Sequence, residues 1–220
     1  MKPIEQDIKN LKSHHAQMWE LVETQVKRAY AAFEKNDLDM ALEVISREKM
    51  VNAQELVCDH HCENFIALFN PVAIDLRFVI SLLKINNNLE RIGDFCESIA
   101  IYVKNNQDKP IDVQLRKDLH LKEMMDVTLR MLEIARTSLL KEDSSMATKV
   151  LSMDDMVDKY NIAAVPTLGK YISAHPEVAE EMLRLYVVIR RMERIGDRFK
   201  NIAEDIVFYI DAKELRHKIR

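Results

Sequence analysis

The chain has 220 residues, of which 48% are hydrophobic, and a net charge of −4 from 32 basic and 36 acidic side chains. This is the balance of an ordinary globular protein, and it excludes the dense basic face of a typical nucleic-acid-binding protein. No run approaches the roughly 18 apolar residues of a membrane-spanning helix, and the N-terminal segment has no apolar signal core. Three cysteines, an odd number, favour reduced thiols in a cytoplasm.

Apolar residues at helical spacing predict six helices, and the presence of only three glycines favours long helices with few tight turns. The predicted helices cover, in chain order, about residues 4–36, 37–69, 71–104, 111–140, 143–174 and 176–215. A polar loop at 105–110 divides the chain near its middle. Pro166 and Gly169 lie inside the fifth helix and are expected to kink it. The tail at 216–220 is expected to be a frayed basic end.

The second half of the sequence repeats the first. Asp37-x-x-Met40-Ala41-x-x-Val44 recurs as Asp143-x-x-Met146-Ala147-x-x-Val150, at an offset of 106 residues. Glu90-Arg91-Ile92-Gly93-Asp94 recurs as Glu193-Arg194-Ile195-Gly196-Asp197, at an offset of 103 residues. Two matches in the same order indicate a duplicated unit of roughly 105 residues.

We therefore predict an all-α fold of two tandem antiparallel three-helix bundles, with the first repeat at 1–106 and the second at 107–220. The sequence leaves open whether the two bundles share an interface or sit end to end.

Two of the predicted helices carry polar side chains where the apolar spacing places the core. These positions hold Glu48 and Asn52 in the second helix, and Asp154 and Asp158 in the fifth. A buried carboxylate is costly unless it is paired or bound to a cation.

The third and sixth helices supply partners for these groups. Glu90 and Asp94 form an i, i+4 pair beside the apolar stripe, and Glu193 and Asp197 do the same in the second repeat. Such pairs on facing helices can surround a hard or borderline cation with oxygen ligands. The alternative is a solvated helix face on which the acidic side chains pair with neighbouring arginines.

The motif recurs beside an identical glycine, in a chain with three glycines, and this favours a metal site over a solvated face in the second repeat. In the first repeat, where Asn52 replaces a carboxylate, the two interpretations are evenly balanced. Gly93 and Gly196 are predicted to mark close approach between helices, because the sequence has no Gly-rich loop for binding phosphate.

At these residues the chain resembles the PhoU family of phosphate-uptake regulators. The matching stretches are Asn70–Arg77, Leu89–Asp94 and the second copy at Met192–Asp197. The resemblance covers essentially the whole chain, including its length and its duplication. Asn52 stands where the family usually has Asp, and Arg198 stands where a His is frequent.

The resemblance implies two three-helix bundles, a cytoplasmic location, homodimers, multinuclear metal clusters on the acidic motifs, and no catalysis. It also implies negative regulation of phosphate signalling, through contact with the nucleotide-binding subunit of the phosphate transporter and with a sensor histidine kinase. The protein would then reach the membrane only through protein partners.

The expected metal ligands, for Fe, Zn, Mn or Mg, are Glu48, Glu90, Asp94, Asp154, Asp158, Glu193 and Asp197. The expected partner contacts are Arg77, Arg91 and Arg194, each of which lies in a motif but off the predicted core stripe. No catalytic residue and no organic cofactor are expected.

Other patterns and functions were weighed against these. Cys58 and Cys62, one turn apart with His61 between them, fit a core thiol pair better than a zinc site, because no second Cys/His pair completes a tetrahedral set. The basic stretch at 190–200 fits either an acidic partner or a solvated helix face. An accessory protein of a sodium–phosphate carrier remains an alternative. A carboxylate-bridged metalloenzyme is less favoured, because the acidic motifs lack the required Glu-x-x-His spacing.

Overall fold

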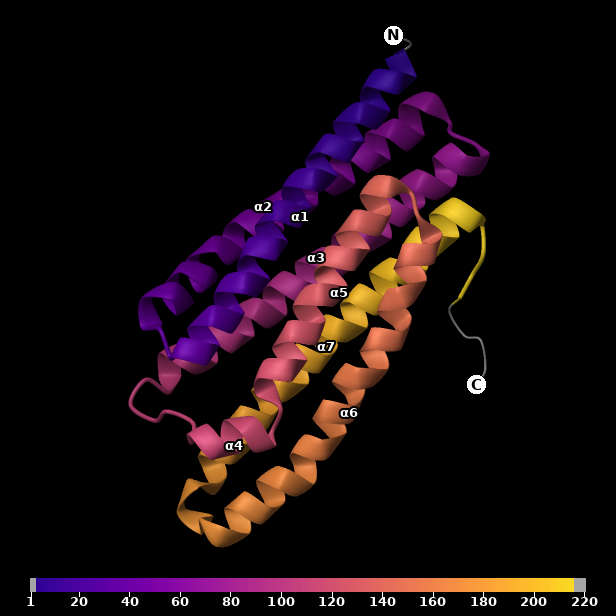
Figure 1. Cartoon of the computed structure of the whole chain (residues 1–220). Coiled ribbons are helices and arrows are strands. Elements are labelled where there is room, and N and C mark those ends of the chain that lie inside the picture. The colour runs from indigo at the N-terminus through magenta and orange to yellow at the C-terminus, as the bar shows by residue number, and fades with distance from the viewer. Residues whose placement is uncertain (1–2, 216–220) are drawn as a thin grey trace.

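Figure 1 shows the computed structural model, which describes residues 3–215. This part of the chain contains seven α-helices and one short 3₁₀-helix, and it has no strand. The helices are α1 (Pro3–Lys35), α2 (Leu38–Phe69), α3 (Ala73–Asn105), α4 (Val113–Asp118), α5 (Leu121–Lys141), α6 (Ser144–Ala174) and α7 (Ala179–Asp211), with the 3₁₀-helix η1 (Pro176–Val178) before α7. The predicted frayed tail at 216–220 lies outside the described residues.

The second helix of each repeat begins at an aspartate cap. The side chain of Asp37 accepts a hydrogen bond from the backbone N–H of Met40 at 3.0 Å, and the side chain of Asp143 accepts from those of Ser145 and Met146. Such caps satisfy amides that have no partner inside the helix. The repeated Asp-x-x-Met motif is therefore a duplicated helix start.

The prediction of one helix over 111–140 is wrong, because the chain breaks between α4 and α5. His120 adopts the left-handed conformation, with φ 52° and ψ 35°, and it separates two helices. Leu119 and Leu121 are both almost fully buried. Residues two apart point in very different directions on one continuous helix, so the break allows both leucines to face the core.

The helices form two antiparallel three-helix bundles, α1–α2–α3 and α5–α6–α7, which confirms the predicted fold class (Figure 1). The two bundles share a long interface, along which α3 packs against α7. Phe78 contacts Tyr209 near one end of this interface, with ring centroids 5.1 Å apart, and Arg198 reaches Asn88 nearer its middle. The two third helices thus run antiparallel, and the open question of bundle arrangement is settled as a side-by-side pairing.

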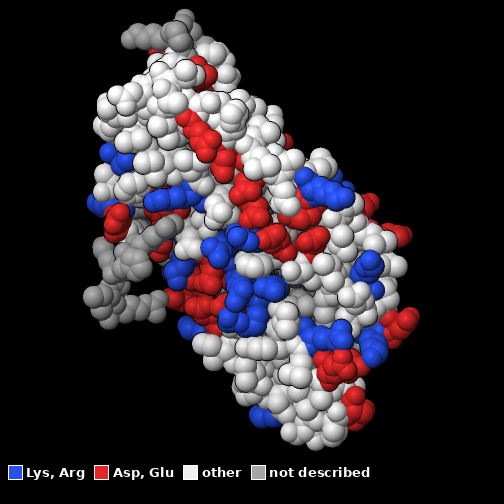
Figure 2. All heavy atoms as spheres, turned by 180° about the vertical axis from the view of Figure 1, so that it is seen from behind, with Lys and Arg blue, Asp and Glu red and all other residues white. Residues whose placement is uncertain are grey.

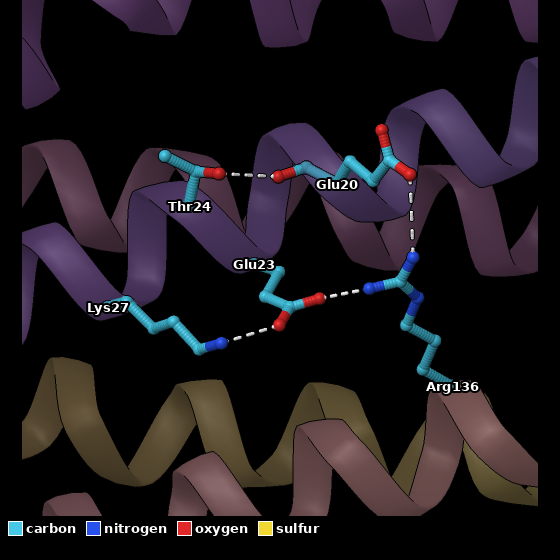
Figure 3. A network of polar contacts seen from close by, with 5 residues as sticks. All are labelled: Glu20, Glu23, Thr24, Lys27 and Arg136. Atoms are coloured by element: carbon cyan, nitrogen blue, oxygen red, sulfur yellow. Dashed lines mark hydrogen bonds and ion pairs between the residues drawn. The ribbon is translucent and has the colours of Figure 1, made fainter.

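A polar network adds a second connection between the bundles, from α1 to α5 (Figure 3). Arg136 of α5 forms ion pairs with Glu23 and, at 3.6 Å, with Glu20 of α1. Lys27 pairs with the same Glu23 at 2.6 Å, and the Thr24 hydroxyl donates to the backbone oxygen of Glu20 at 2.8 Å. Arg136 therefore bridges two carboxylates of the other repeat.

The predicted core position of Asn52 is wrong. The buried stripe of α2 runs through Val44, Glu48 and Val51 and continues at Cys58, so position 52 points outward. Taking Ile45 in place of Val44 as the core residue shifts the predicted stripe onto position 52. The predicted stripe of α6 has the same error of phase. Asp154 is fully buried as that stripe requires, but Asp158 is only half-buried.

Gly93 and Gly196 lie where the second and third helices of each repeat approach closely, as predicted. A Cβ on Gly93 would lie 3.1 Å from both carboxylate oxygens of Glu48 and from Cγ1 of Val51. A Cβ on Gly196 would lie 3.3 Å from Cγ1 of Val157 and 3.4 Å from Oδ1 of Asp154. Each glycine therefore allows a buried carboxylate to sit against a facing helix.

The Gly93→Ala variant is expected to lower the free energy of unfolding by about 1–2 kcal/mol, because overpacking of this contact outweighs the higher helix propensity of alanine. The control is Gly169→Ala in α6, where an added Cβ meets no atom within 4 Å. That variant is expected to be more stable than the wild type by roughly 0.5–1 kcal/mol. Urea unfolding measures both values, and a stabilised Gly93→Ala protein would contradict the close approach.

Candidate metal centres

The acidic side chains of the second repeat meet between α6 and α7. Asp154, Asp158 and Asp197 each bring one carboxylate oxygen to within 4.8 Å of the others. Asp154 is fully buried, Asp158 and Asp197 are half-buried, and the predicted fourth member, Glu193, is 9% exposed. The cluster therefore lies at the edge of the core and is open on one side.

Two cations offset part of this negative charge. Lys200 Nζ lies 2.6 Å from Oδ2 of Asp154, and a guanidinium nitrogen of Arg190 lies 3.2 Å from Oε1 of Glu193. The other oxygens, Oδ1 of Asp154 and Oε2 of Glu193, are buried and have no hydrogen-bond partner. Burial, reinforced by the neighbouring carboxylates, raises the pKa values of Asp154, Glu193 and Asp197. The cluster thus has buried acceptor oxygens in excess of its donors.

This donor set fits a metal ion that prefers oxygen ligands. The carboxylates converge, the buried oxygen Oδ1 of Asp154 has no partner, and Gly196 leaves the space beside that oxygen free of a side chain. Asp154, Asp158 and Asp197 are the residues that would hold the ion, with Glu193 beside them. A bound cation would neutralise carboxylates that otherwise repel one another.

The first repeat holds a second acidic cluster around Glu48, which is 4% exposed. Gln25 of α1 donates a hydrogen bond to Oε2 of Glu48 at 3.2 Å, while Oε1 is buried without a partner. Burial, together with the nearby Asp94, Glu97 and Glu90, raises the pKa of Glu48 to about 7. Burial also raises the pKa of Glu90, with Asp94 as the next cause. The charges of Glu90 and Asp94 therefore act on Glu48, whereas convergence of carboxylate oxygens to within 4.8 Å is found among the described residues only for Asp154, Asp158 and Asp197.

The two clusters differ at positions that the sequence analysis did not assign to either acidic site. Glu97 faces the first cluster, and the residue 103 positions later is Lys200, whose ammonium group enters the second cluster. Glu55 also joins the first cluster, where Asp59 and Asp94 contribute to a pKa that burial raises. Continuing the buried stripe of α2 by one helical turn beyond Val51 would have pointed to Glu55.

The predicted partner residues lie at different depths. Arg91 and Arg194 are exposed on α3 and α7, and Arg91 pairs with Asp94 at 3.0 Å and with Glu90 at 3.5 Å. Arg77 is half-buried, and its Nε donates to the backbone oxygen of Tyr209 at 3.4 Å. Arg77 therefore contributes to the interface between the bundles, whereas the other two arginines face solvent.

Acidic and basic side chains gather side by side across the middle of the face in Figure 2. Such a mixed surface holds opposite charges in fixed positions, which gives specificity to contacts with a protein partner.

Within residues 3–215, no group of three or more ligand atoms that could hold a metal ion includes a cysteine or a histidine. Cys58 and Cys62 are fully buried, and Sγ of Cys62 lies 3.9 Å from Nε2 of His15, which is also buried. His14 stacks on His61, with ring centroids 4.0 Å apart. Burial raises the pKa of Cys62 to about 12, so this thiol belongs to the core, as predicted.

The fold and the acidic residues define a duplicated helical-bundle protein in which each repeat buries a carboxylate of its second helix, Glu48 or Asp154. Among the described residues, no helix is both long enough and apolar enough to span a membrane. The family model of the PhoU domain matches the chain twice, over residues 16–103 and 121–206. The chain therefore belongs to the PhoU family.

Similar proteins agree with this assignment. The phosphate-specific transport system accessory protein PhoU of Escherichia coli is 30% identical over 214 residues, which cover 96% of this chain and 86% of that protein. The crystal structure of PhoU from Pseudomonas aeruginosa superimposes with a TM-score of 0.90 at 27% identity, over 95% of this chain and 99% of the other. A PhoU regulatory protein from Streptococcus pneumoniae shares the fold at a TM-score of 0.84, with 23% identity over 96% of this chain and 99% of the other.

Proposed function

We propose that this protein is a negative regulator of phosphate uptake and of phosphate-starvation signalling. In this role it is an adaptor between the nucleotide-binding subunit of a phosphate ABC transporter and a sensor histidine kinase, and it has no turnover of its own. The main support is the match of both halves of the chain to the PhoU domain, together with relatives named as accessory proteins of phosphate-specific transport.

In this proposal the metal ions are structural and hold the helices of each repeat together. The candidate ligands are Asp154, Asp158, Glu193 and Asp197 in the second repeat, and Glu48, Glu90 and Asp94 in the first. The second repeat is favoured because its carboxylate oxygens converge most closely among the described residues. The ion is Fe, Zn, Mn or Mg, and the protein acts as a cytoplasmic homodimer that meets the membrane only through its partners.

Arg77, Arg91 and Arg194 are the proposed contacts with the partner proteins. A variant in which the two exposed residues, Arg91 and Arg194, become Gln is expected to bind the transporter nucleotide-binding subunit at least about tenfold more weakly, because interfacial charges set specificity and association rate. The matched control changes two exposed arginines elsewhere, Arg130 and Arg184, to Gln.

Surface-plasmon resonance with the purified transporter subunit and the kinase measures these affinities. If the wild-type protein binds neither partner, the adaptor role is wrong. Binding to a sodium–phosphate carrier instead would make the protein an accessory protein of that carrier. Neighbouring genes distinguish the same two roles, because an ABC phosphate transporter gene supports the first and a sodium–phosphate carrier gene supports the second.

A further inference from the structure

An open cleft of about 640 Å³ lies between α3 and α7, where the two bundles meet. Its walls carry Lys84, Asn87 and Asn88 from α3, and Arg198, Asn201 and Glu204 from α7. None of these residues belongs to the acidic clusters or to the proposed partner contacts. The volume is in the range of small-molecule binding sites, so a molecule larger than a single ion fits.

The cleft presents two cations from opposite walls. The guanidinium of Arg198 donates one long hydrogen bond, 3.4 Å from Nη1 to Oδ1 of Asn88, and its Nε is buried without a hydrogen-bond partner. Lys84 Nζ lies 3.8 Å from the nearly buried Asp205, beyond the distance of a hydrogen bond. Both cations therefore keep donors for an additional acceptor.

The duplication shows that this cleft is particular to one side of the pseudo-symmetric interface. The two repeats are offset by 103 residues in these helices, so the position equivalent to Asn88 is Arg191 and the position equivalent to Arg198 is Phe95. The Arg191 guanidinium lies over the Phe95 ring, 5.5 Å from its centroid. A cation is thus held against an aromatic ring at the equivalent place, whereas Arg198 faces an amide beside open space.

We propose that this cleft binds the phosphate group of a small molecule, either free orthophosphate or a phosphomonoester such as a nucleotide. A guanidinium and an ammonium on facing walls suit a compact oxyanion, and guanidinium in particular binds phosphate through paired hydrogen bonds. The amides Asn87 and Asn201 offer further donors, and Leu83 adds an apolar surface for the rest of a larger ligand. This binding does not depend on the adaptor role.

Isothermal titration calorimetry of the full chain with orthophosphate and AMP tests the proposal. The titrations use chelator-treated protein and Mg²⁺-reloaded protein, so that phosphate bound to a metal ion is recognised by its dependence on the metal. Orthophosphate or AMP is expected to bind in both states. Tighter binding of AMP identifies a phosphomonoester as the ligand, and binding of orthophosphate alone identifies the free ion.

Two variants locate the binding. Arg198→Gln is expected to weaken binding at least about tenfold, while Arg184→Gln, the same change at an exposed position of the same helix, leaves it unchanged. Circular dichroism and melting temperature establish that each variant folds. The proposal is overturned if no ligand binds at about 10 mM, or if Arg198→Gln and Arg184→Gln bind equally well.

Discussion

Asp158→Asn is expected to abolish most of the rise in melting temperature that a bound metal ion gives to this protein. Oxygen-ligand cations bind more tightly as the number of charged ligands increases, and Asp158 is one of the three convergent carboxylates. A metal ion at a hundred times its dissociation constant stabilises the native state by about 2.7 kcal/mol. For a chain of this size, that corresponds to roughly 5–10 °C, most of which the variant should lose.

Differential scanning calorimetry with and without EDTA measures this shift, and elemental analysis of protein purified without chelator measures the metal content. Asp155→Asn is the matched control, because it makes the same change on α6 three residues before Asp158, outside the convergent set. Glu90→Gln should have the smaller effect, since the second repeat is the favoured site. If Asp158→Asn retains both the metal and the thermal shift, the cluster is a salt-bridged helix surface.

Lys200→Met is expected to destabilise the metal-free protein and to strengthen metal binding. Without metal, the variant leaves the fully buried Asp154 carboxylate without its counterion at 2.6 Å, and loss of one partner of a buried ion pair costs about 3–5 kcal/mol. With metal, the variant should bind the ion more tightly than the wild type, because an ammonium group no longer competes for Asp154.

Chemical unfolding in EDTA and calorimetric titration with Mn²⁺ or Zn²⁺ measure the two effects of Lys200→Met. Arg190→Met is a useful comparison, because it removes the cation beside Glu193 and leaves the cation beside Asp154 in place. Weaker metal binding by Lys200→Met would mean that the lysine supports the site. Unchanged stability in EDTA would mean that Asp154 is protonated in the apoprotein.

Most of the fold could be predicted from the sequence because long helices leave a strong periodic signal. Apolar residues at helical spacing in α3, such as Phe78, Leu89 and Ile99, are buried in the core. The break at His120 could not be predicted, since neither Gly nor Pro marks it and only the burial of both flanking leucines explains it. The pairing of α3 with α7 was also not predictable, because apolar spacing identifies a buried face but not its partner.

The acidic clusters were only partly predictable. Repetition of the Glu-Arg-Ile-Gly-Asp motif pointed to both sites, and the structure brings one carboxylate oxygen each of Asp154, Asp158 and Asp197 to within 4.8 Å of the others. An error of one residue in the phase of α2 placed Asn52 in the core, and Glu55 was not proposed as a member of the first acidic cluster. Lys200 was treated as part of a basic surface stretch, since nothing in its neighbours shows that its side chain reaches Asp154 on another helix.

Expression of phosphate-starvation genes in a strain that lacks this protein tests the regulatory role most directly. In phosphate-rich medium the deletion strain is expected to express these genes strongly, and a plasmid copy of the wild-type gene is expected to silence them again. Quantitative RT-PCR of the phosphate transporter operon measures both states. Expression that stays low in the deletion strain in phosphate-rich medium would contradict the proposal that this protein is a negative regulator of phosphate signalling.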